Sequence, residues 1–485
     1  MEIKMKIKDI LDLRPSDLSE TEALGITRLP DECLDGFIFF DLPKSDGGMH
    51  KFKRLKGHPA LVVCQRDSEY NSGNYPIIYT DNARREYSIA LCRYFGVDLS
   101  KTRLIGVTGT CGKTTTATLI YELGMSMGLK VGLIGTGKIL INREIITEDS
   151  YSMTTPDPEL LYPTLRRMQD MGCELIVMEA SSHALALMKL EPLKFDIGIF
   201  TNLSEEHLDF HPDIEDYFNT KMRLLEKSKL SIISSSSEYG RLAHLRFSGK
   251  SLLVGKSDGC DMRYEACEYI GGGMSRLVIR RGDDTAQAIS PLVGEFNAYN
   301  ILCALSCMMA LGYELSSLVP HLNSIRASGR MSVTERGGIR VIRDFAHTPD
   351  ALLKLLEFAN SICISGQNII TVFGCGGERD RLKRAKSLQI AASHSSFVVV
   401  TSDNPRGEGR AKILFDMLDT CEYKNLSIML DREVAIKYAI TRAVAGDTVI
   451  IAGKGDEKFI NEGGALIPFS EDEIIARALL GKDGV

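Results

Sequence analysis

Apolar runs of strand length, separated by polar turns and helical stretches, recur along the whole chain. In the first hundred residues, the apolar runs at 36–42, 60–65 and 75–80 predict strands. Residues 83–96 follow with the spacing of a helix. This alternation predicts a compact N-terminal α/β domain over residues 1–100.

A second region, residues 101–328, begins with an apolar run that enters a glycine-rich turn and leaves as a helix ending near Gly128. Helical stretches separate several of the apolar runs that follow, which is typical of a largely parallel sheet covered on both faces. We expect a hairpin turn at the glycines 271–273. Further strands are predicted at 130–135, 173–180, 196–203 and 229–236.

The alternation restarts around Gly329 and Arg330, which places a third α/β domain at residues 329–485. A length of 485 residues fits three domains, since a domain averages about 150 residues. The predicted fold class is therefore α/β, with a central nucleotide-binding domain on a mainly parallel sheet and a Rossmann-like C-terminal domain. The strands of the last domain are predicted at 338–346, 367–374, 396–402 and 447–455.

Composition narrows the class of protein. The chain is 44% hydrophobic and 25% charged, which excludes a disordered chain, and its net charge of −6 gives no overall attraction for nucleic acid. Its twelve cysteines form no CxxC pair, so we expect reduced thiols. No apolar run reaches the roughly 18 residues that a membrane-spanning helix needs. We expect a cytoplasmic monomer that acts on small molecules.

The segment from Gly106 to Thr114 contains the residues that a triphosphate site needs. Small residues let backbone N–H groups face the phosphates, and the following helix adds a favourable dipole. We expect Lys113 to reach the terminal phosphates and Thr114 to offer its hydroxyl to magnesium. The spacing departs from the strict Walker pattern, because Val107 stands where that pattern has glycine. The alternative is a tight strand-to-helix turn with an incidental lysine.

Three polar residues extend this candidate site. Glu179 ends an apolar run, and His207 and Asp209 follow the next one. Because parallel strands expose functional residues at a shared edge, a carboxylate and an imidazole near Thr114 indicate a magnesium site. In the alternative interpretation, Glu179 caps a helix and His207 is a hydrogen-bonded surface residue.

The chain carries these motifs in order: GVTGTCGKTT (106–115), MTTPDP (153–158), MEASSHAL (178–185), TNLSEEHLDFH (201–211), EFNAYN (295–300), GR (329–330) and DFAHTPDAL (344–352). Together they resemble the motifs of the Mur ligases, ATP-dependent enzymes that join an amino acid to a growing peptidoglycan precursor. The resemblance runs from about residue 100 to the end. Three further motifs narrow the resemblance to the MurE type: VFGCGGERDRLKR (372–384), SDNPR (402–406) and AGKGDE (452–457). Ligases of this type add the third residue to UDP-N-acetylmuramoyl-L-alanyl-D-glutamate.

The resemblance implies ATP and two magnesium ions, with Lys113, Glu179, His207 and Lys221 as the catalytic residues. Thr114, Glu179 and His207 would hold magnesium. Lys221 falls where the family carries a carbamylated lysine, which could bind the second ion; the alternative is a solvated helix lysine. The nucleotide would contact Gly109, Thr110, Gly112, Lys113, Thr114, Thr115, Asn300, Arg330 and Asp344.

The resemblance also implies where the other two substrates bind. The tetrapeptide 403–406 has the form associated with meso-diaminopimelate, and the planar guanidinium of Arg406 suits the distal carboxylate of that amino acid. The alternative is a turn with an exposed arginine. The amino-acid pocket would comprise Arg379, Asn404, Arg406, Gly453 and Glu457, and the nucleotide-sugar peptide would contact Thr154, Thr155, Ser182 and Lys189.

Two departures from the family pattern concern the substrates. Asp456 stands where histidine is usual, and we expect it to add a negative charge to the amino-acid pocket. Leu29, Pro30 and Asp31 stand where an Asp-Ser-Arg motif usually helps to dock UDP. Either UDP is held differently or the acceptor is another carboxylate.

The predicted function is therefore addition of meso-diaminopimelate to UDP-N-acetylmuramoyl-L-alanyl-D-glutamate through an acyl phosphate. One alternative is a divergent ligase of the same family that uses L-lysine or another carboxylate acceptor. An alternative of a different class is a nucleotide-binding regulatory protein that no longer ligates.

Overall fold

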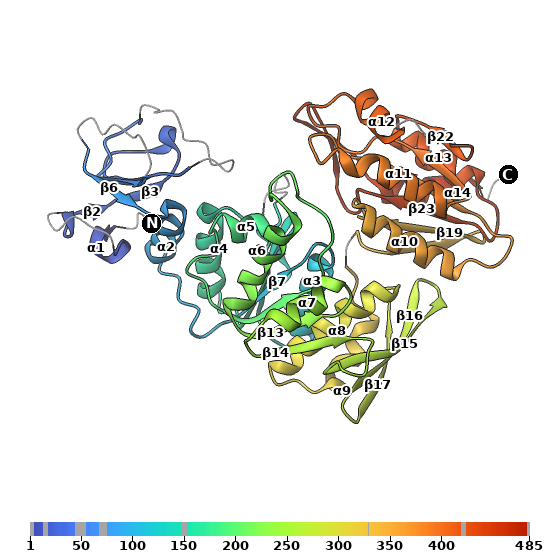
Figure 1. Ribbon diagram of the computed structural model, residues 1–485, viewed down its shortest axis with the longest axis horizontal. Coiled ribbons are helices and arrows are strands. Elements are labelled where there is room, and N and C mark those ends of the chain that lie inside the picture. The colour runs from blue at the N-terminus through green and yellow to red at the C-terminus, as the bar shows by residue number, and fades with distance from the viewer. Residues whose placement is uncertain are drawn as a thin grey trace.

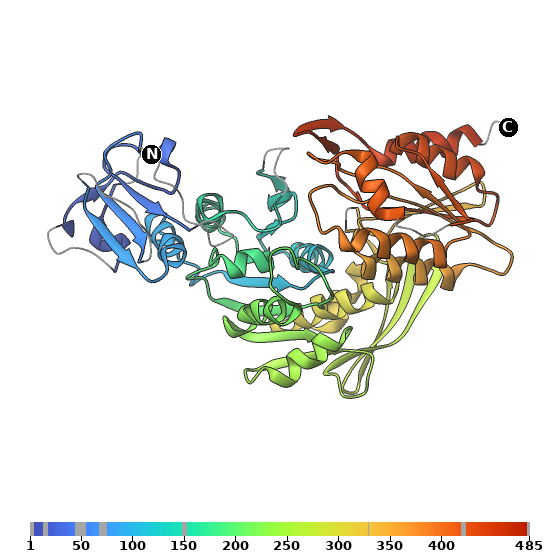
Figure 2. The ribbon, with the colours of Figure 1, turned by 45° about the horizontal axis from the view of Figure 1, so that its top comes forward.

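The chain forms three lobes in a computed structural model (Figure 1). The N-terminal and C-terminal lobes lie at opposite ends, and the central lobe lies between them (Figures 1 and 2). The structure describes residues 4–12, 18–43, 55–66, 75–147, 153–327, 329–418 and 423–482.

A parallel four-stranded sheet organises the N-terminal lobe. The three predicted strands and the predicted helix are confirmed, whereas the short first strand of the sheet was not predicted. In spatial order the sheet contains β3 (Gly25–Thr27), β4 (Phe37–Asp41), β5 (Leu61–Gln65) and β6 (Ile77–Thr80), followed along the chain by α2 (Ala83–Tyr94). Beside it lie β1 (Met5–Lys6), α1 (Ile7–Ile10) and β2 (Glu22–Ala23).

The central lobe is built on an eleven-stranded sheet of order β10-β9-β8-β11-β7-β12-β13-β14-β15-β16-β17. Its middle part, from β8 to β15, is parallel as predicted, and both margins are antiparallel. The predicted hairpin turn joins β15 (Met262–Gly271) to β16 (Met274–Arg281). The other strands are β7 (Arg103–Thr108), β8 (Val131–Gly135), β9 (Lys138–Ile141), β10 (Glu144–Ile145), β11 (Leu175–Glu179), β12 (Phe195–Phe200), β13 (Ser228–Ser234), β14 (Ser251–Gly255) and β17 (Asp284–Ser290).

Successive side chains of β7 enter different hydrophobic cores on the two faces of this sheet. Ile105 and Val107 pack with α3 (Lys113–Ser126) and α8 (Glu295–Ala310), whereas Leu104 packs with α4 (Pro158–Asp170). Burial on both faces explains why the central strands are apolar almost throughout. Among the described residues, the lobe also has the α-helices α5 (Ser182–Ala186), α6 (Ile214–Glu226), α7 (Glu238–Arg246) and α9 (Leu315–Leu318) and a 3₁₀ helix at Val319–Asn323.

The C-terminal lobe has a six-stranded sheet of order β18-β19-β23-β20-β21-β22, parallel except for β18. Helices α10 and α11 share one core with it, and α13 and α14 share the other. All four strands predicted here are confirmed. The bounds are β18 (Ser332–Arg336), β19 (Ile339–Asp344), α10 (Pro349–Ile362), β20 (Ile369–Phe373), α11 (Leu382–His394), β21 (Phe397–Val400), α12 (Arg410–Leu418), β22 (Leu426–Ile428), α13 (Arg432–Arg442), β23 (Thr448–Ala452), β24 (Phe459–Glu462), β25 (Ala465–Pro468) and α14 (Glu471–Lys482).

The central sheet changes winding direction at β7, because β8 lies beyond β11 on one side and β12 lies on the other. Ligands of open α/β sheets bind at the carboxyl ends of strands at such a point. Across the described residues, no helix combines the length and apolar character needed to cross a bilayer. The eleven cysteines within them are free, and most are buried.

Candidate active site

The phosphate loop follows β7 at the switch point of the sheet. Gly109 and Gly112 have positive φ angles of 149° and 85°, and Gly112 is the N-cap residue of α3. A β-carbon at Gly109 would lie 1.9 Å from Thr201 Oγ1, and one at Gly112 would lie 2.4 Å from Asn300 Oδ1. The predicted strand, loop and helix are confirmed, and the glycines are required by close neighbours.

The Nζ atoms of two lysines meet at one carbonyl oxygen of this loop. Lys113 Nζ donates to Gly109 O and Thr110 O, and Lys221 Nζ also donates to Gly109 O, each at 2.9 Å. Lys221 is 1% exposed and lies 4.4 Å from the Tyr217 ring centroid, so the alternative of a solvated helix lysine is wrong. Burial and the charge of Lys113 hold the pKa of Lys221 well below its ordinary value, which favours a neutral amine.

Glu179 ends β11 with its side chain buried. Thr114 Oγ1 donates to Glu179 Oε2 at 3.0 Å. Thr136 donates its backbone N–H to Oε1 at 2.8 Å and its hydroxyl to Oε2 at 3.2 Å. The alternative in which Glu179 caps a helix is therefore wrong. A hydroxyl and a carboxylate in contact are hard oxygen donors that fit magnesium, which usually completes its shell with phosphate oxygens and water.

His207 follows β12 in a left-handed backbone conformation, with φ of 58°. Its ring centroid lies 5.0 Å from that of His183, and its Nε2 lies 3.7 Å from Glu206 Oε2. Burial lowers the pKa of His207 to about 4, so the imidazole is neutral at pH 7, the form that binds a metal. Among the residues that the structure describes, no three or more His, Cys, Asp or Glu side chains are grouped to hold a metal by themselves.

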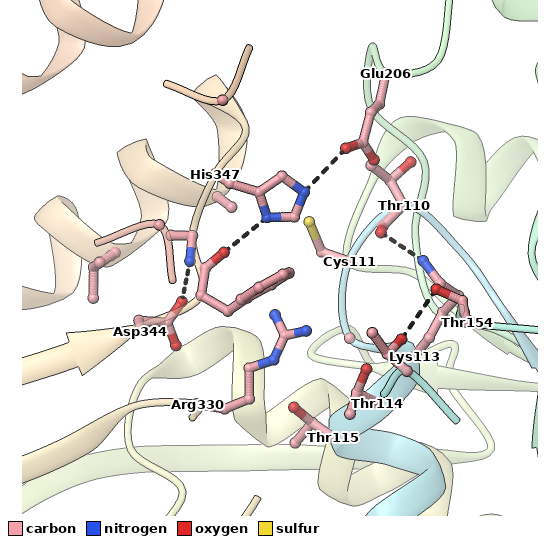
Figure 3. Close-up of a pocket in the computed structure, with 18 of the residues that line it drawn as sticks. Thr110, Cys111, Lys113, Thr114, Thr115, Thr154, Glu206, Arg330, Asp344 and His347 are labelled. Atoms are coloured by element: carbon pink, nitrogen blue, oxygen red, sulfur yellow. Dashed lines mark hydrogen bonds and ion pairs between the residues drawn. The ribbon is translucent and has the colours of Figure 1, made fainter. Parts of the chain in front are cut away.

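One cavity of about 410 Å³ lies between the central and C-terminal lobes (Figure 3). Eight of the nine residues predicted to contact the nucleotide border it, and Gly109 is the exception. All five residues predicted to bind the amino acid border the same cavity. The fold therefore brings together two sets of residues that lie up to several hundred positions apart in the sequence.

Arg330 and Asp344 reach this cavity from the C-terminal side, as Figure 3 shows. The guanidinium of Arg330 lies 4.4 Å from the centroid of the Phe345 ring. Asp344 accepts backbone N–H groups from Met331 and Ala346, both at 2.8 Å. Burial raises the pKa of the Asp344 carboxyl. Both side chains are thus fixed by neighbours of their own lobe while facing the phosphate loop.

Glu206 and His347 connect the two walls of the cavity, and neither was predicted as a site residue. His347 Nε2 lies 3.4 Å from Glu206 Oε1, and Figure 3 shows the imidazole pointing toward that carboxylate. Burial acts to raise the pKa of Glu206, but the hydrogen bond from His347 and nearby positive charges outweigh it, so the pKa is well below its ordinary value. Their places inside the motifs TNLSEEHLDFH and DFAHTPDAL are the signal that could have identified them.

Arg406 is half-buried at the border of the cavity, so the alternative of a turn with an exposed arginine is wrong. Its backbone is left-handed, with φ of 53°, and its Nη1 donates to Gly377 O at 2.9 Å and to Asn404 O at 3.4 Å. Burial and the charge of Arg379 lower its pKa. Asn404 Nδ2 donates to Glu457 Oε2 at 2.7 Å. The pocket therefore presents both guanidinium donors and a carboxylate acceptor.

Asp456 does not border this pocket. Its Oδ1 lies 3.1 Å from Arg343 Nη2, and Asp472 Oδ1 lies 2.7 Å from the same nitrogen. Asp456 instead borders a second cavity, beside Arg343. The prediction that Asp456 adds a negative charge to the amino-acid pocket is wrong, because an arginine of β19 pairs with the carboxylate on the other side.

The residues predicted to hold the nucleotide sugar lie beside Glu179. Thr155 Oγ1 donates to the backbone oxygen of Glu179 at 2.7 Å, and Thr154 Oγ1 accepts from Thr136 Oγ1 at 3.1 Å. Ser182 Oγ is buried and has no hydrogen-bond partner among the described residues. A buried hydroxyl without a partner is costly, and Ser182 does not border the cavity between the lobes.

Lys189 lies at the junction with the N-terminal lobe. Its Nζ pairs with Asp157 at 2.6 Å, and Asp157 also pairs with Arg28 of that lobe at 3.1 Å. Arg28 contacts Glu159 as well. The sequence reasoning missed Arg28, which directly precedes residues 29–31, where the usual docking motif is absent. This arginine supplies a cation at the junction and links the two lobes.

These features define a class of protein: a phosphate-loop nucleotide-binding protein that shares one cavity with a second α/β lobe. Two family models match the chain, the Mur ligase middle domain over residues 107–308 and the Mur ligase, glutamate ligase domain over residues 329–455. The chain belongs to the Mur ligase family, which confirms the resemblance found in the sequence.

Relatives match nearly the whole chain. A UDP-N-acetylmuramoyl-L-alanyl-D-glutamate–2,6-diaminopimelate ligase of Aquifex aeolicus is 34% identical over 95% of this chain and 94% of its own. The enzyme of the same name from Trichormus variabilis is also 34% identical, over 99% and 100%. A solved structure of a ligase with that name covers 100% of both chains, with 26% identity and a TM-score of 0.68. The fold also resembles the Thermotoga maritima MurF ligase in complex with ADP, at 18% identity, coverage of 94% and 97%, and a TM-score of 0.60.

Gly112→Ala is expected to weaken ADP binding by at least about tenfold, because its methyl group would meet Asn300 in a left-handed backbone position. Gly128→Ala is the matched control, since Gly128 follows the other end of α3 with φ of 83° and open space around it. Calorimetric titration with ADP measures the dissociation constant of each variant. An equal loss in the two variants would contradict the importance of the contact with Asn300.

Proposed function

We propose that this protein adds meso-diaminopimelate to UDP-N-acetylmuramoyl-L-alanyl-D-glutamate, with cleavage of ATP to ADP and phosphate. The observation that supports this most strongly is the single cavity bordered by both the phosphate loop and the Arg406 pocket. Relatives that are 34% identical over nearly the whole chain carry the activity in their names.

The chemistry begins with activation of a carboxylate, which is a poor electrophile. An oxygen of the D-glutamate side-chain carboxylate attacks the γ-phosphorus of ATP, ADP leaves, and an acyl phosphate forms. The amine of meso-diaminopimelate then attacks the acyl carbon, phosphate leaves, and the amide forms with loss of a proton. Positioning and charge stabilisation are sufficient for both steps, so no covalent enzyme nucleophile is needed.

The residues of the central lobe have separate roles in this proposal. Lys113 stabilises the charge of the transferred phosphoryl group, since its ammonium already lies at the loop that would hold the phosphates. Thr114, Glu179 and His207 would hold magnesium, and Lys221 a second ion after carbamylation; bound magnesium would offset the negative charge of the phosphate oxygens.

The C-terminal lobe holds the incoming amino acid. Arg379 and Arg406 provide N–H donors for its distal carboxylate, and Glu457 provides an acceptor for its ammonium group. L-lysine lacks the distal carboxylate, so it would leave the two arginines without their partner. This difference favours meso-diaminopimelate as the substrate.

A second candidate is a Mur ligase that acts on another carboxylate acceptor. It is favoured by the segment 29–31, which supplies neither the hydroxyl nor the cation of the usual UDP-docking motif. The cation adjacent in sequence, Arg28, is already engaged by Asp157 and Glu159.

An assay of phosphate release separates these candidates. We expect release when ATP, magnesium, UDP-N-acetylmuramoyl-L-alanyl-D-glutamate and meso-diaminopimelate are all present, with an amide product seen by mass spectrometry. Replacing meso-diaminopimelate by L-lysine should nearly abolish it. Inactivity with every UDP-muramoyl peptide, but activity with another acid, would establish the second candidate. ADP binding without any amide product would instead indicate a regulatory protein.

Arg406→Ala is expected to raise the KM for meso-diaminopimelate by roughly tenfold to a hundredfold, because a charged bidentate contact is lost. The KM for ATP should remain within about twofold of its original value. Lys113→Ala should abolish turnover instead. Steady-state kinetics with each substrate varied in turn measures these effects, and an equal loss of both apparent affinities in the Arg406 variant would refute its assignment.

We propose further that Lys221 carries a carbamate, formed when its neutral amine attacks carbon dioxide and releases a proton. The burial of the amine supports this, and the adjacent Lys113 would offset the new negative charge. Protein incubated with ¹³C-bicarbonate should give a carbamate signal by ¹³C NMR, and Lys221→Arg should lose both this signal and turnover. Lys229→Arg, at an exposed lysine, is the control. Full activity in bicarbonate-free buffer without a signal would contradict the modification.

A further inference from the structure

Lys454 lies behind the wall of the amino-acid pocket, in the turn after β23. It is 0% exposed and does not border the cavity. Its Nζ donates to Asn404 Oδ1 at 3.1 Å and to Glu457 Oε2 at 2.8 Å, and it lies 3.8 Å from Asp403 Oδ1. A single buried cation therefore contacts three residues that do border the cavity.

These contacts determine which way the side-chain amide of Asn404 points. An ammonium group donates hydrogen bonds and cannot accept them, and the same holds for a backbone N–H group. Asn404 Oδ1 accepts both the Nζ of Lys454 and the backbone N–H of Asn461, the latter at 2.9 Å. A flipped amide would direct its NH₂ group at two donors and lose both bonds, one of them charge-assisted.

The other end of the amide is fixed as well. Asn404 Nδ2 donates to Glu457 Oε2 at 2.7 Å. Its second N–H has no hydrogen-bond partner within the described part of the chain, and Asn404 borders the cavity. Toward a ligand, the Asn404 side chain is thus a donor, although an isolated asparagine could serve as donor or acceptor.

We propose that Lys454 is a positioning residue that holds the amide of Asn404 with its N–H groups toward the pocket, and so makes the pocket select an amino acid with a carboxylate at its far end. This inference rests on the function proposed above. In this proposal, a lysine that the substrate cannot reach sets the orientation of the Asn404 amide, which would contact the substrate.

The charges around Lys454 give the pocket one region for the ammonium group of the substrate and another for its distal carboxylate. Its ammonium engages Oε2 of Glu457, which leaves Oε1 of this 38% exposed side chain for the substrate ammonium. Arg406, Arg379 and the Asn404 amide then offer only donors to the distal carboxylate. The pocket has one acceptor region and one donor region, which matches a zwitterion and mismatches a plain aliphatic amine.

The test compares meso-diaminopimelate with L-lysine in the wild type and in Lys454→Met. We expect kcat/KM for meso-diaminopimelate to fall by roughly tenfold or more, because the amide becomes free to flip. The KM for ATP and kcat/KM for L-lysine should change by less than about threefold. The preference for meso-diaminopimelate over L-lysine is therefore expected to fall. If Lys454 has a purely structural role, kcat/KM for both amino acids will fall by the same factor, and that result would overturn the inference.

Two further variants make the comparison specific. Lys454→Gln keeps an N–H donor for Asn404 Oδ1, so it should retain more of the preference than Lys454→Met; equal behaviour of the two would contradict the proposal. Lys458→Met is the matched control, because Lys458 borders the second cavity instead. If Lys454→Met fails to fold, Lys454→Met/Asp403→Asn takes its place, since it removes one charge of each sign from the cluster.

Binding measurements distinguish failure of this inference from failure of the proposed function. Calorimetric titration of the ADP-loaded protein with each amino acid requires no turnover. If the wild type prefers meso-diaminopimelate and Lys454→Met does not, the inference holds whatever the acid substrate is. If the wild type binds both amino acids equally, the inference is wrong even in an active ligase. Absence of amide product with UDP-muramoyl peptides refutes only the proposed function.

Discussion

The carbonyl oxygen of Gly109 accepts hydrogen bonds from the Nζ atoms of two lysines, Lys113 and Lys221, and the geometry of the phosphate loop depends on this shared contact. Lys113 begins the helix after the loop, and Lys221 comes from α6, so the contact joins both elements to the switch point of the sheet. Burial and the nearby charge of Lys113 disfavour a second positive charge here, which is why the pKa of Lys221 is depressed. A phosphate oxygen is a stronger acceptor than a carbonyl, so bound triphosphate would draw the Lys113 ammonium away from Gly109 O.

The cavity requires two sheets whose strand ends carry different chemistry. In the central lobe the carboxyl ends present glycines, a lysine and a carboxylate, which suit phosphates. In the C-terminal lobe they lead to arginines, an asparagine and a glutamate, which suit a zwitterion. The contact between Glu206 and His347 spans the two walls, so that the phosphate-loop surface and the arginine-rich surface face the same cavity. Activation of an acid and capture by an amine can then occur without release of the activated intermediate.

Much of this arrangement follows from local patterns in the sequence. Short apolar runs between helical stretches predicted the parallel strands, because strands buried on both faces must be apolar throughout. The glycines around Lys113 predicted the phosphate loop, since only glycine tolerates its φ angles and close contacts. Ordered motifs predicted the Arg406 pocket, all of whose predicted members border the cavity.

What the sequence could not provide depends on contacts between distant residues. Asp456 is directed away from the amino-acid pocket by Arg343, which lies 113 positions earlier in the chain. Helical spacing around Lys221 could not separate a solvated lysine from a buried one, because its burial is created by Tyr217 and the phosphate loop. The link from Arg28 to Asp157 likewise exists only after two lobes have folded and docked.

That link has an evolutionary consequence. The N-terminal lobe has its own sheet and meets the central lobe through a shared apolar core and through the ion pairs of Arg28, outside the cavity where the phosphate loop and the Arg406 pocket meet. No described residue of this lobe borders the cavity, so substitutions on its surface can accumulate without direct contact with the bond-forming centre. The N-terminal lobe can therefore diverge in sequence, as residues 29–31 do from the family pattern, while the two walls of the cavity keep their residues.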